Sequence, residues 1–501
     1  MNPLAGFSKK KLPSNPLLYE INTAVWLAEL SRRHGRAVTF DTIPPSELDT
    51  IASHGFNLIW LMGIWRRGVE GRRMLLNDDS SRADFSRALP SWTEEQIIGS
   101  PLAVAAYEPD ARFGTWQSLA KLRSQCAARG MGLALDVVAN HTAIDHPWVT
   151  LAPRRYVLGT EADFISQPEA YCSCGDAYGT VIAKGRDPYF PAWPDTAQLN
   201  IFDAETRREL IAEFRTIADH CDAIIAHMAQ LSLNDIFQSN WGAPMERATG
   251  APHAEFWNQA ITATRKTIWI AEAYWDTEET LQQQGFDYTV DKRLYDHLLS
   301  GSTSRIREHL QGELEFQRRS VRFIENHNEA RAAYAFGEEH LKAPAVLLAT
   351  VPGLRLFHGG QLEGQRVRIP LPMTVARENG PSLQVMGLYD KLLQLSHSPV
   401  FADGQWLLRE VSRAYDDTAD NLLAYTWSHK ANLSLVVVNP GHRRAQGMAP
   451  LYDAIEPSRE YLLIDELTGI RYRRHGKQLF SPGLHVILDP FDAHILKITA
   501  V

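Results

Sequence analysis

Hydrophobic residues in the first four-fifths of the chain form short apolar runs that alternate with segments of helical periodicity. The runs predict buried strands at 18–26, 55–61, 131–138, 223–228, 267–273, 321–324 and 354–358. The clearest amphipathic segments predict helices at 46–54, 115–129, 206–220 and 343–351. Continuous apolar strands that alternate with helices are typical of a parallel sheet covered on both faces. Roughly eight such units predict a (β/α)8 barrel.

The pattern changes at two places, and these changes predict the domain organisation. Segment 142–200 is too long for an ordinary connection and is rich in Pro, Gly and aromatic residues, so we expect an inserted subdomain after the third strand. From about Gln405, short apolar runs separated by turn residues predict an antiparallel β domain. The predicted fold class is therefore α/β: a (β/α)8 TIM barrel from 1–141 and 201–395, the insertion 142–200, and a C-terminal β-sandwich domain from 400–501.

Composition and charge exclude several classes of protein. Of the 501 residues, 45% are hydrophobic and 22% are charged, which is typical of a globular protein. A net charge of −8 argues against a nucleic-acid partner, because no basic excess is available to neutralise phosphates. The longest apolar stretch, 343–357, is interrupted and too short to span a bilayer. Lys9–Lys11 are not followed by the apolar segment of a signal peptide, and four cysteines do not make a disulfide framework. We therefore expect a cytoplasmic protein. We expect its ligand to be a small molecule.

Polar residues gather at the carboxyl ends of four predicted strands. They are Asp136 with Asn140 and His141, then Asp222 with His227, then Glu272, and finally Asn326, His327 and Asn328. A single residue of this kind usually caps its own strand. In a TIM barrel, however, the carboxyl ends of the strands carry the chemistry, and polar groups on consecutive strands therefore predict one functional site.

These segments resemble signatures of the alpha-amylase family of glycoside hydrolases, family 13. Residues 136–141 (DVVANH) resemble its first signature, Asp-x-x-x-Asn-His, and 323–328 (FIENHN) resemble the signature that ends in Asn-His-Asp. Residues 268–275 (IWIAEAYW) resemble the strand that carries the general acid, and 100–107 (SPLAVAAY) an earlier segment in which an aromatic side chain faces the sugar. The resemblance covers nearly the whole chain, and it implies the same three-part architecture and a carbohydrate ligand by ancestry.

The sequence departs from the family at positions expected to surround one sugar ring. The family nucleophile is an Asp in a stretch of the form Gly-x-Arg-x-Asp, and here the matching residues 222–228 (DAIIAHM) place His227 at the Asp position and Ile225 at the Arg position. Asn328 replaces the Asp of the third signature, and Leu102 replaces the expected aromatic. The matching positions that remain are Glu272 as acid/base, together with Asp136, His141, Asn326 and His327.

These replacements predict that retaining hydrolysis of alpha-glucosides is absent or very weak. We expect His227 to be neutral at pH 7 and a poor substitute for a carboxylate nucleophile. Ile225 and Leu102 make the pocket less polar, which we expect to raise the pKa of Glu272. Asp222 is an alternative nucleophile, but it begins the fourth strand, whereas the nucleophile should end it.

Three interpretations of the site stay open from sequence. The first is a carbohydrate site that binds but does not cut. The second is a repurposed or engineered pocket that uses His227, Glu272 or both as general base and acid on a non-glycoside substrate. The third is a structural protein that keeps only the folded barrel. No cofactor or metal is expected, although a divalent ion on His141, His227, His327, Glu272 and Asp136, or structural calcium near Asn140, is left open.

Overall fold

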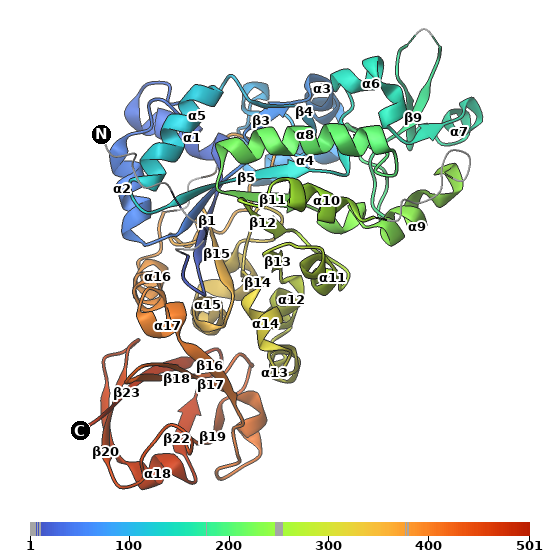
Figure 1. Cartoon of the computed structure of the whole chain (residues 1–501). Helices are drawn as coiled ribbons and strands as arrows, with labels where there is room; N and C mark the ends of the chain where they lie inside the picture. Colours follow the sequence, from blue (N-terminus) through green and yellow to red (C-terminus); the bar gives the residue numbers. More distant parts are fainter. Residues whose placement is uncertain are drawn as a thin grey trace.

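The computed structural model describes residues 7, 9, 12–176, 178–245, 254–375, 377 and 380–501. It confirms the predicted barrel, because eight parallel strands close in the order β1-β15-β14-β13-β12-β11-β5-β2 (Figure 1). Their bounds are β1 Leu17–Asn22, β2 Leu58–Met62, β5 Gly132–Val138, β11 Ala223–His227, β12 Ile268–Ala271, β13 Tyr288–Val290, β14 Ser320–Arg322 and β15 Leu354–His358.

The barrel strands are largely apolar because both of their faces are buried. Every residue of β2, β5 and β11 is buried. Alternate side chains fill the barrel interior, including Leu18, Trp60, Ile225 and Ile270. The helices of the chain are α1 Thr23–His34, α2 Pro45–Ser53, α3 Val69–Asn77, α4 Asp79–Ala88, α5 Trp116–Ala127, α6 Pro147–Leu151, α7 Glu161–Ser166, α8 Ala204–His220, α9 Asn234–Met245, α10 Phe256–Ala263, α11 Glu278–Gln283, α12 Lys292–Ser300, α13 Thr303–Leu310, α14 Leu314–Arg318, α15 Lys342–Thr350, α16 Leu383–Ser396, α17 Pro399–Asp403 and α18 Gly476–Phe480.

The first predicted strand is too long. The apolar run 18–26 leaves the barrel after Asn22, because the side chain of Asn22 accepts a hydrogen bond from the backbone N–H of Val25 (3.3 Å) and caps α1. The short barrel strand β13 and the pair β3 Trp65–Arg67 and β4 Val104–Pro109 were not predicted. The hydrophobic pattern of these strands is too short to distinguish them from loops.

Segment 142–200 contains small elements of its own. Strand β6 (His141–Ala143) pairs with β10 (Thr196–Gln198). Between them, β7 Leu158–Gly159, β9 Val181–Ala183 and β8 Tyr171–Ser173 form a three-stranded antiparallel sheet at the right edge of Figure 1. This segment follows β5, the third barrel strand, and it covers one side of the carboxyl end of the barrel.

The chain ends in an antiparallel β domain, as predicted. Its main sheet has the order β16-β17-β18-β23-β20-β21, and β19 pairs with β22. The bounds are β16 Gln405–Arg409, β17 Leu423–His429, β18 Asn432–Val438, β19 Ala445–Ala449, β20 Glu460–Asp465, β21 Arg471–His475, β22 Leu484–Leu488 and β23 Ala493–Ala500.

One face of the main C-terminal sheet packs on the barrel helices. Leu423, Tyr425 and Trp427 of β17 belong to the same hydrophobic cluster as the barrel. Ala424, between two of these residues, and Leu422, just before the strand, belong to the separate core of the β domain. The sheet therefore lies between two cores, below α15 in Figure 1. Among the described residues, no helix is both long and apolar enough to cross a membrane.

Candidate functional site

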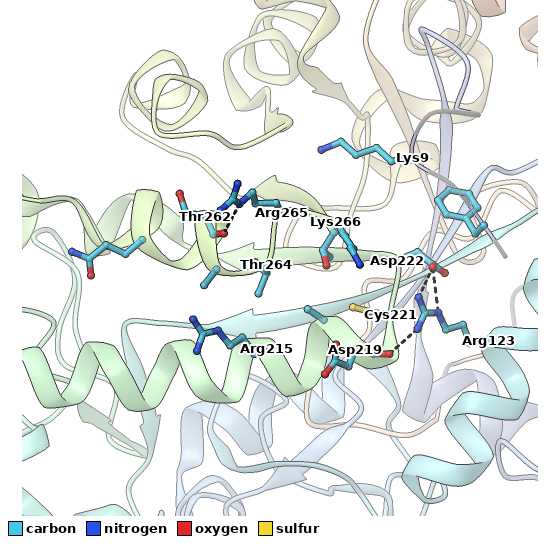
Figure 2. A pocket seen from close by; sticks show the side chains of 15 residues that line it. Lys9, Arg123, Arg215, Asp219, Cys221, Asp222, Thr262, Thr264, Arg265 and Lys266 are labelled. Atoms are coloured by element: carbon cyan, nitrogen blue, oxygen red, sulfur yellow. Dashed lines mark hydrogen bonds and ion pairs between the residues drawn. The ribbon is translucent and has the colours of Figure 1, made fainter.

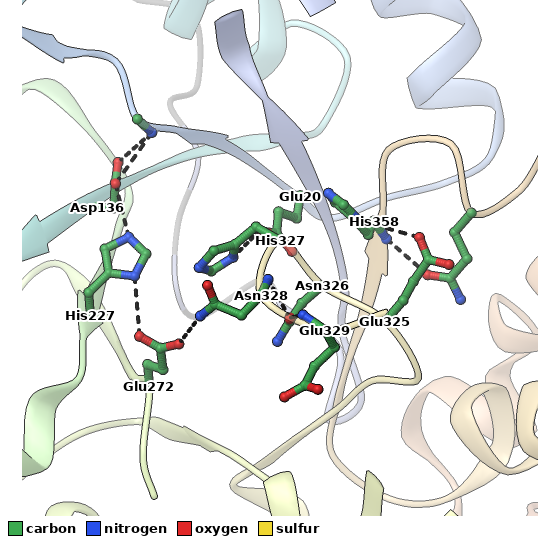
Figure 3. A network of polar contacts seen from close by, with 12 residues as sticks. Glu20, Asp136, His227, Glu272, Glu325, Asn326, His327, Asn328, Glu329 and His358 are labelled. Carbon is green, nitrogen blue, oxygen red and sulfur yellow. Dashed lines mark hydrogen bonds and ion pairs between the residues drawn. The ribbon is translucent and has the colours of Figure 1, made fainter. Parts of the chain in front are cut away.

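The polar residues predicted from four strand ends meet at the carboxyl end of the barrel. Asp136 lies on β5, and His227 is the last residue of β11. Glu272 directly follows β12, and Asn328 lies in the segment after β14. In Figure 3 they form one continuous line of contacts from Asp136 through His227 and Glu272 to Asn328. Parallel strands bring their carboxyl ends to one rim, which is why sequence spacing could predict this convergence.

His227 bridges two buried carboxylates. Its Nε2 lies 3.0 Å from Oδ2 of Asp136, and its Nδ1 lies 3.3 Å from Oε2 of Glu272. All three residues are less than 5% exposed. The backbone N–H of Gly63 also donates to both carboxylate oxygens of Asp136 (3.2 and 3.3 Å). Both nitrogens of the imidazole are therefore engaged by carboxylates from neighbouring strands.

Three further donors surround the carboxylate of Glu272. The backbone N–H of Met228 donates to Oε2 at 2.9 Å. The hydroxyl of Tyr274 and the amide of Asn328 each donate to Oε1 at 2.8 Å. Sequence reasoning missed Tyr274 and Met228. Tyr274 could have been noticed because it lies two residues beyond Glu272, on the same side of extended backbone.

The charge states of His227 and Glu272 differ from those predicted. Burial alone would lower the pKa of His227, but its hydrogen bonds to Asp136 and Glu272 raise that pKa to about 10. Burial likewise opposes the charge of Glu272, yet the hydrogen bond and positive charge of His227 lower the pKa of Glu272 to about 2. The predictions of a neutral His227 and a raised Glu272 pKa are therefore wrong, because each group is the other's counter-ion.

His327 is held by a residue that sequence reasoning missed. Its Nδ1 lies 2.5 Å from Oε1 of Glu20, a buried carboxylate on β1. The same contact lowers the pKa of Glu20 against the opposing effect of burial. On the other side of the His327 ring, Nε2 is buried and has no hydrogen-bond partner among the described residues. No sequence motif links Glu20 to His327, 307 positions away.

The remaining predicted site residues lie around this centre. Asn326 turns the segment after β14, because its side-chain oxygen accepts from the backbone N–H groups of Asn328 and Glu329 (both 2.9 Å). Ile225 is buried and lines a small cavity with Glu272, Asn326 and His327. The cavity has room of about 10 Å³ for the centre of a water molecule, close to the minimum for one water.

His141 and Leu102 lie outside the line of contacts that Figure 3 draws. Burial lowers the pKa of His141 to about 3, although its ring hydrogen-bonds to the backbone of Leu102. The ring of His141 also packs 5.1 Å from that of Trp193. Leu102 is partly buried against the main core. The side-chain oxygen of Asn140, where calcium was left open, accepts a hydrogen bond from Gln198 at 3.0 Å.

One group of potential metal ligands is present at this centre. His227, Glu272 and His327 each offer a ligand atom, and these atoms all lie within 4.8 Å of one another. The sequence analysis left five residues open as metal ligands. Among the described residues, only these three of the five belong to the group. Asp136 instead faces the other nitrogen of His227.

Asp222, the alternative nucleophile, lies at the opposite end of the barrel. It directly precedes β11 and accepts hydrogen bonds from Arg123 (2.7 Å) and from the backbone N–H of Leu133 (2.8 Å). Figure 2 shows it in a cavity of about 1160 Å³ that the starts of β11 and β12 line together with Arg215 and Lys266. His227, which ends the same strand, is therefore the residue that reaches the carboxyl rim.

An exposed aromatic pair lies at the rim of the barrel. Tyr189 of the segment 142–200 and Trp275, which follows β12, have ring centroids 5.0 Å apart. Tyr189 is 69% exposed and Trp275 is 38% exposed, and Phe190 beside them is also exposed. Trp275 and Asp276 both have φ of +61°, a strained conformation for residues other than glycine.

The comparisons with known proteins point in one direction. No family model matches the chain. Alpha-amylase MalA from Haloarcula japonica is 24% identical over 339 residues, which cover 67% of this chain and 46% of that protein. Palatinase from Erwinia rhapontici is 24% identical over 103 residues, 21% of this chain and 14% of that protein. The chain thus spans less than half the length of either of these curated relatives.

Solved structures match over almost the full length. A noncanonic maltogenic alpha-amylase, AmyB from Thermotoga neapolitana, has a TM-score of 0.69 at 20% identity, covering 97% of this chain and 99% of that chain. An alpha-amylase from Lactobacillus plantarum has a TM-score of 0.64 at 17% identity, with 97% and 99% covered. The chain therefore has the scaffold of the alpha-amylase family, a (β/α)8 barrel followed by a C-terminal β domain.

Proposed function

We propose that the chain is a homologue of the alpha-amylase glycoside hydrolases that binds carbohydrate and does not hydrolyse alpha-glucosides by the retaining mechanism. The observation that carries this proposal is the position of His227. It ends β11, where the resemblance expects the nucleophile, and it lies between the carboxylates of Asp136 and Glu272.

The chemistry of retaining hydrolysis supports the first half of the proposal. That reaction needs two carboxyl groups about 5 Å apart, one to attack the sugar and one to protonate the leaving group. An imidazole with both nitrogens directed at carboxylates offers no free lone pair for attack. Glu272 accepts from Met228, Tyr274 and Asn328 as well as facing His227, so its oxygens serve as acceptors rather than as a proton source.

The rim of the barrel supports the second half of the proposal, that the chain binds carbohydrate. Exposed aromatic rings are suited to stacking on the C–H faces of sugars, and the pair Tyr189 and Trp275 provides such a surface. The named relatives are alpha-amylases and a palatinase, which favours a carbohydrate as the ligand. The small volume beside Glu272 favours binding of a sugar at the rim rather than deep in the barrel.

The proposal is tested by measuring turnover and binding on the same preparation. We expect chromogenic alpha-glucosides and malto-oligosaccharides to be cleaved no faster than in buffer, while malto-oligosaccharides change the tryptophan fluorescence saturably. Trp275→Ala should weaken that binding by about fivefold, in line with the loss of roughly 1 kcal/mol of aromatic contact. Tyr452→Ala, which removes an exposed aromatic from the C-terminal domain, should bind like the parent chain.

Two results contradict the proposal. The first is turnover of an alpha-glucoside at an ordinary enzyme rate of about 1 per second or more, which would show that a working nucleophile is present. The second is a lack of saturable binding of any tested oligosaccharide, which would remove the carbohydrate from the proposal.

A further inference from the structure

We propose that the carboxyl end of the barrel binds a divalent transition-metal ion, of which Zn²⁺ is the representative, through His227, Glu272 and His327. The ligand atoms of these three side chains lie within 4.8 Å of one another, and all three side chains are buried. They come from one side of the barrel rim: His227 ends β11, Glu272 follows β12, and His327 follows β14, with β13 between the last two strands.

Each histidine is already oriented by a carboxylate on its far side. Asp136 lies 3.0 Å from Nε2 of His227, which leaves Nδ1 facing Glu272. Glu20 lies 2.5 Å from Nδ1 of His327, which leaves Nε2 facing the centre. Histidines that ligate metals characteristically donate their other ring nitrogen to a carboxylate, because this fixes the ring and strengthens the ligand. Here two independent histidines have this arrangement around one point (Figure 3).

The free nitrogen of His327 is the second, independent observation. Nε2 of His327 is buried and lacks a hydrogen-bond partner among the described residues. An unpaired polar atom in a buried site costs free energy and calls for a partner. His327 lines the small cavity that Glu272 and Asn326 also line. A metal ion there would use that lone pair, and the space suits an ion with one water rather than an organic group.

The donor set selects the class of ion. Two imidazole nitrogens and one carboxylate suit Zn²⁺ or Fe²⁺, whereas Ca²⁺ and Mg²⁺ prefer oxygen ligands throughout. Ligand atoms about 2.0–2.1 Å from one ion cannot be more than about 4.2 Å apart, so any pair of these atoms near the 4.8 Å limit must move closer on binding. The site keeps a position open for water or substrate, as catalytic metal sites do.

The first experiment uses the full, unmodified chain. The protein is stripped with EDTA, dialysed, and titrated with ZnCl₂ by calorimetry and with CoCl₂ by visible absorption. We expect one ion per chain for both metals, and Co²⁺ absorption bands in the visible region of the kind produced by nitrogen ligands in a four- or five-coordinate site. This measurement does not depend on any variant being folded.

Variants then assign the ligands. His327→Gln and Glu272→Gln should each weaken Zn²⁺ binding by at least 100-fold, and Glu20→Gln, which acts through His327, by about 10- to 100-fold. His34→Gln, an exposed histidine at the end of α1, is the matched control and should bind like the parent chain. Far-UV circular dichroism confirms that each variant is folded before its affinity is compared.

Either of two results overturns the inference. One is that the stripped parent chain binds neither Zn²⁺ nor Co²⁺ stoichiometrically. The other is that a folded His327→Gln variant keeps the parent affinity and the parent Co²⁺ spectrum, which would place the ion elsewhere.

Discussion

His227 changes the charge balance at the carboxyl end of the barrel. It stands between Asp136 and Glu272, and all three side chains are almost completely buried. Two carboxylates in such a site repel each other and lack solvent, and the imidazole between them compensates both. In the proposed correspondence with the alpha-amylase family, His227 stands at the position of the nucleophile and supplies the positive charge that an Arg at position 225 would bring.

Removing that imidazole should destabilise the folded chain. In His227→Ala, two buried carboxylates lose their shared counter-ion, so we expect the free energy of unfolding to fall by about 3–5 kcal/mol. Urea unfolding followed by circular dichroism measures this. His34→Ala, at an exposed position, should change it by no more than about 0.5 kcal/mol. Equal stability of the two variants would contradict the role of His227 as counter-ion.

Restoring the residues that the family has at three positions should restore hydrolysis. The combined change His227→Asp, Ile225→Arg and Asn328→Asp returns a carboxylate to the strand end and places a guanidinium next to Asp136, which pairs with position 225 in the register of β5 and β11. We expect cleavage of a chromogenic alpha-glucoside at least 100-fold faster than by the parent chain, since loss of a principal group costs several powers of ten.

The matched control for this reversal is His227→Asp alone. It buries a third carboxylate without the guanidinium, so we expect it to be poorly active and less stable. A triple variant that is folded and no faster than the parent would mean that position 227 does not correspond to the nucleophile.

Sequence alone predicted part of this site. His227, Glu272 and Asn328 could be brought together in advance because each follows a strand of one parallel barrel. Glu20 could not, because it reaches His327 only when β1 closes the barrel against β15. The charge states were also out of reach, since they depend on which nitrogen faces which carboxylate.

Among the elements, the strands that carry the site are better determined by sequence than the ones between them. β5 and β11 are apolar runs apart from Asp136 and His227, and their ends were predicted to within one or two residues. β13 has only three residues, and its place in the barrel is fixed by pairing with β12 and β14 rather than by its own pattern. A short strand of this kind is recognised only from its neighbours.

Asp291 stabilises the barrel next to the short strand β13. It follows β13 and caps α12 by accepting from the backbone N–H of Leu294 at 3.0 Å. It also pairs with Arg322 of β14 and with His309 of α13. Burial opposes its charge, but His309 and Arg322 hold the pKa of Asp291 below its ordinary value.

The lowered pKa of Asp291 gives a pH-dependent contribution to stability. A carboxyl whose pKa is lower in the folded state stabilises the fold above its unfolded pKa of about 3.9 and loses that contribution as the pH falls further. We expect Asp291→Asn to lower the urea midpoint at pH 7 and to flatten its decline below about pH 4. Asp390→Asn, exposed on α16, should reproduce the parent pH profile. A parent-like decline in Asp291→Asn would assign the acid sensitivity to other groups.

At the scale of the whole molecule, the barrel and the C-terminal sheet share one core. Trp427 of β17 donates from its indole N–H to the carbonyl of Thr350 at the end of α15 (2.6 Å), and the hydroxyl of Tyr425 contacts that of Thr350 (2.6 Å). Arg355, buried on β15, has its guanidinium 6.0 Å from the Trp427 ring. These contacts tie the sheet to α15 and to β15, the last strand of the barrel.

Trp427→Ala should therefore destabilise both parts together. Loss of a buried Trp side chain costs about 3–5 kcal/mol, and because the cavity lies between the two parts, their unfolding should remain one transition at a lower temperature. Differential scanning calorimetry measures this. Ile487→Ala, at an exposed position of β22, is the control and should change the midpoint little. Two separate transitions in the parent chain would contradict a shared core.

The alternation of side chains between the two cores along β17 limits where the C-terminal domain can be exchanged for that of a relative. Because odd and even side chains of one strand serve different cores, the C-terminal sheet is not an interchangeable module. A graft from a relative would keep its own inner packing but meet Thr350 and Arg355 with the wrong side chains. A functional chimera must carry Tyr425 and Trp427 with the sheet, or replace α15 and β15 at the same time, so the crossover point belongs before Lys342 rather than at the start of the β domain.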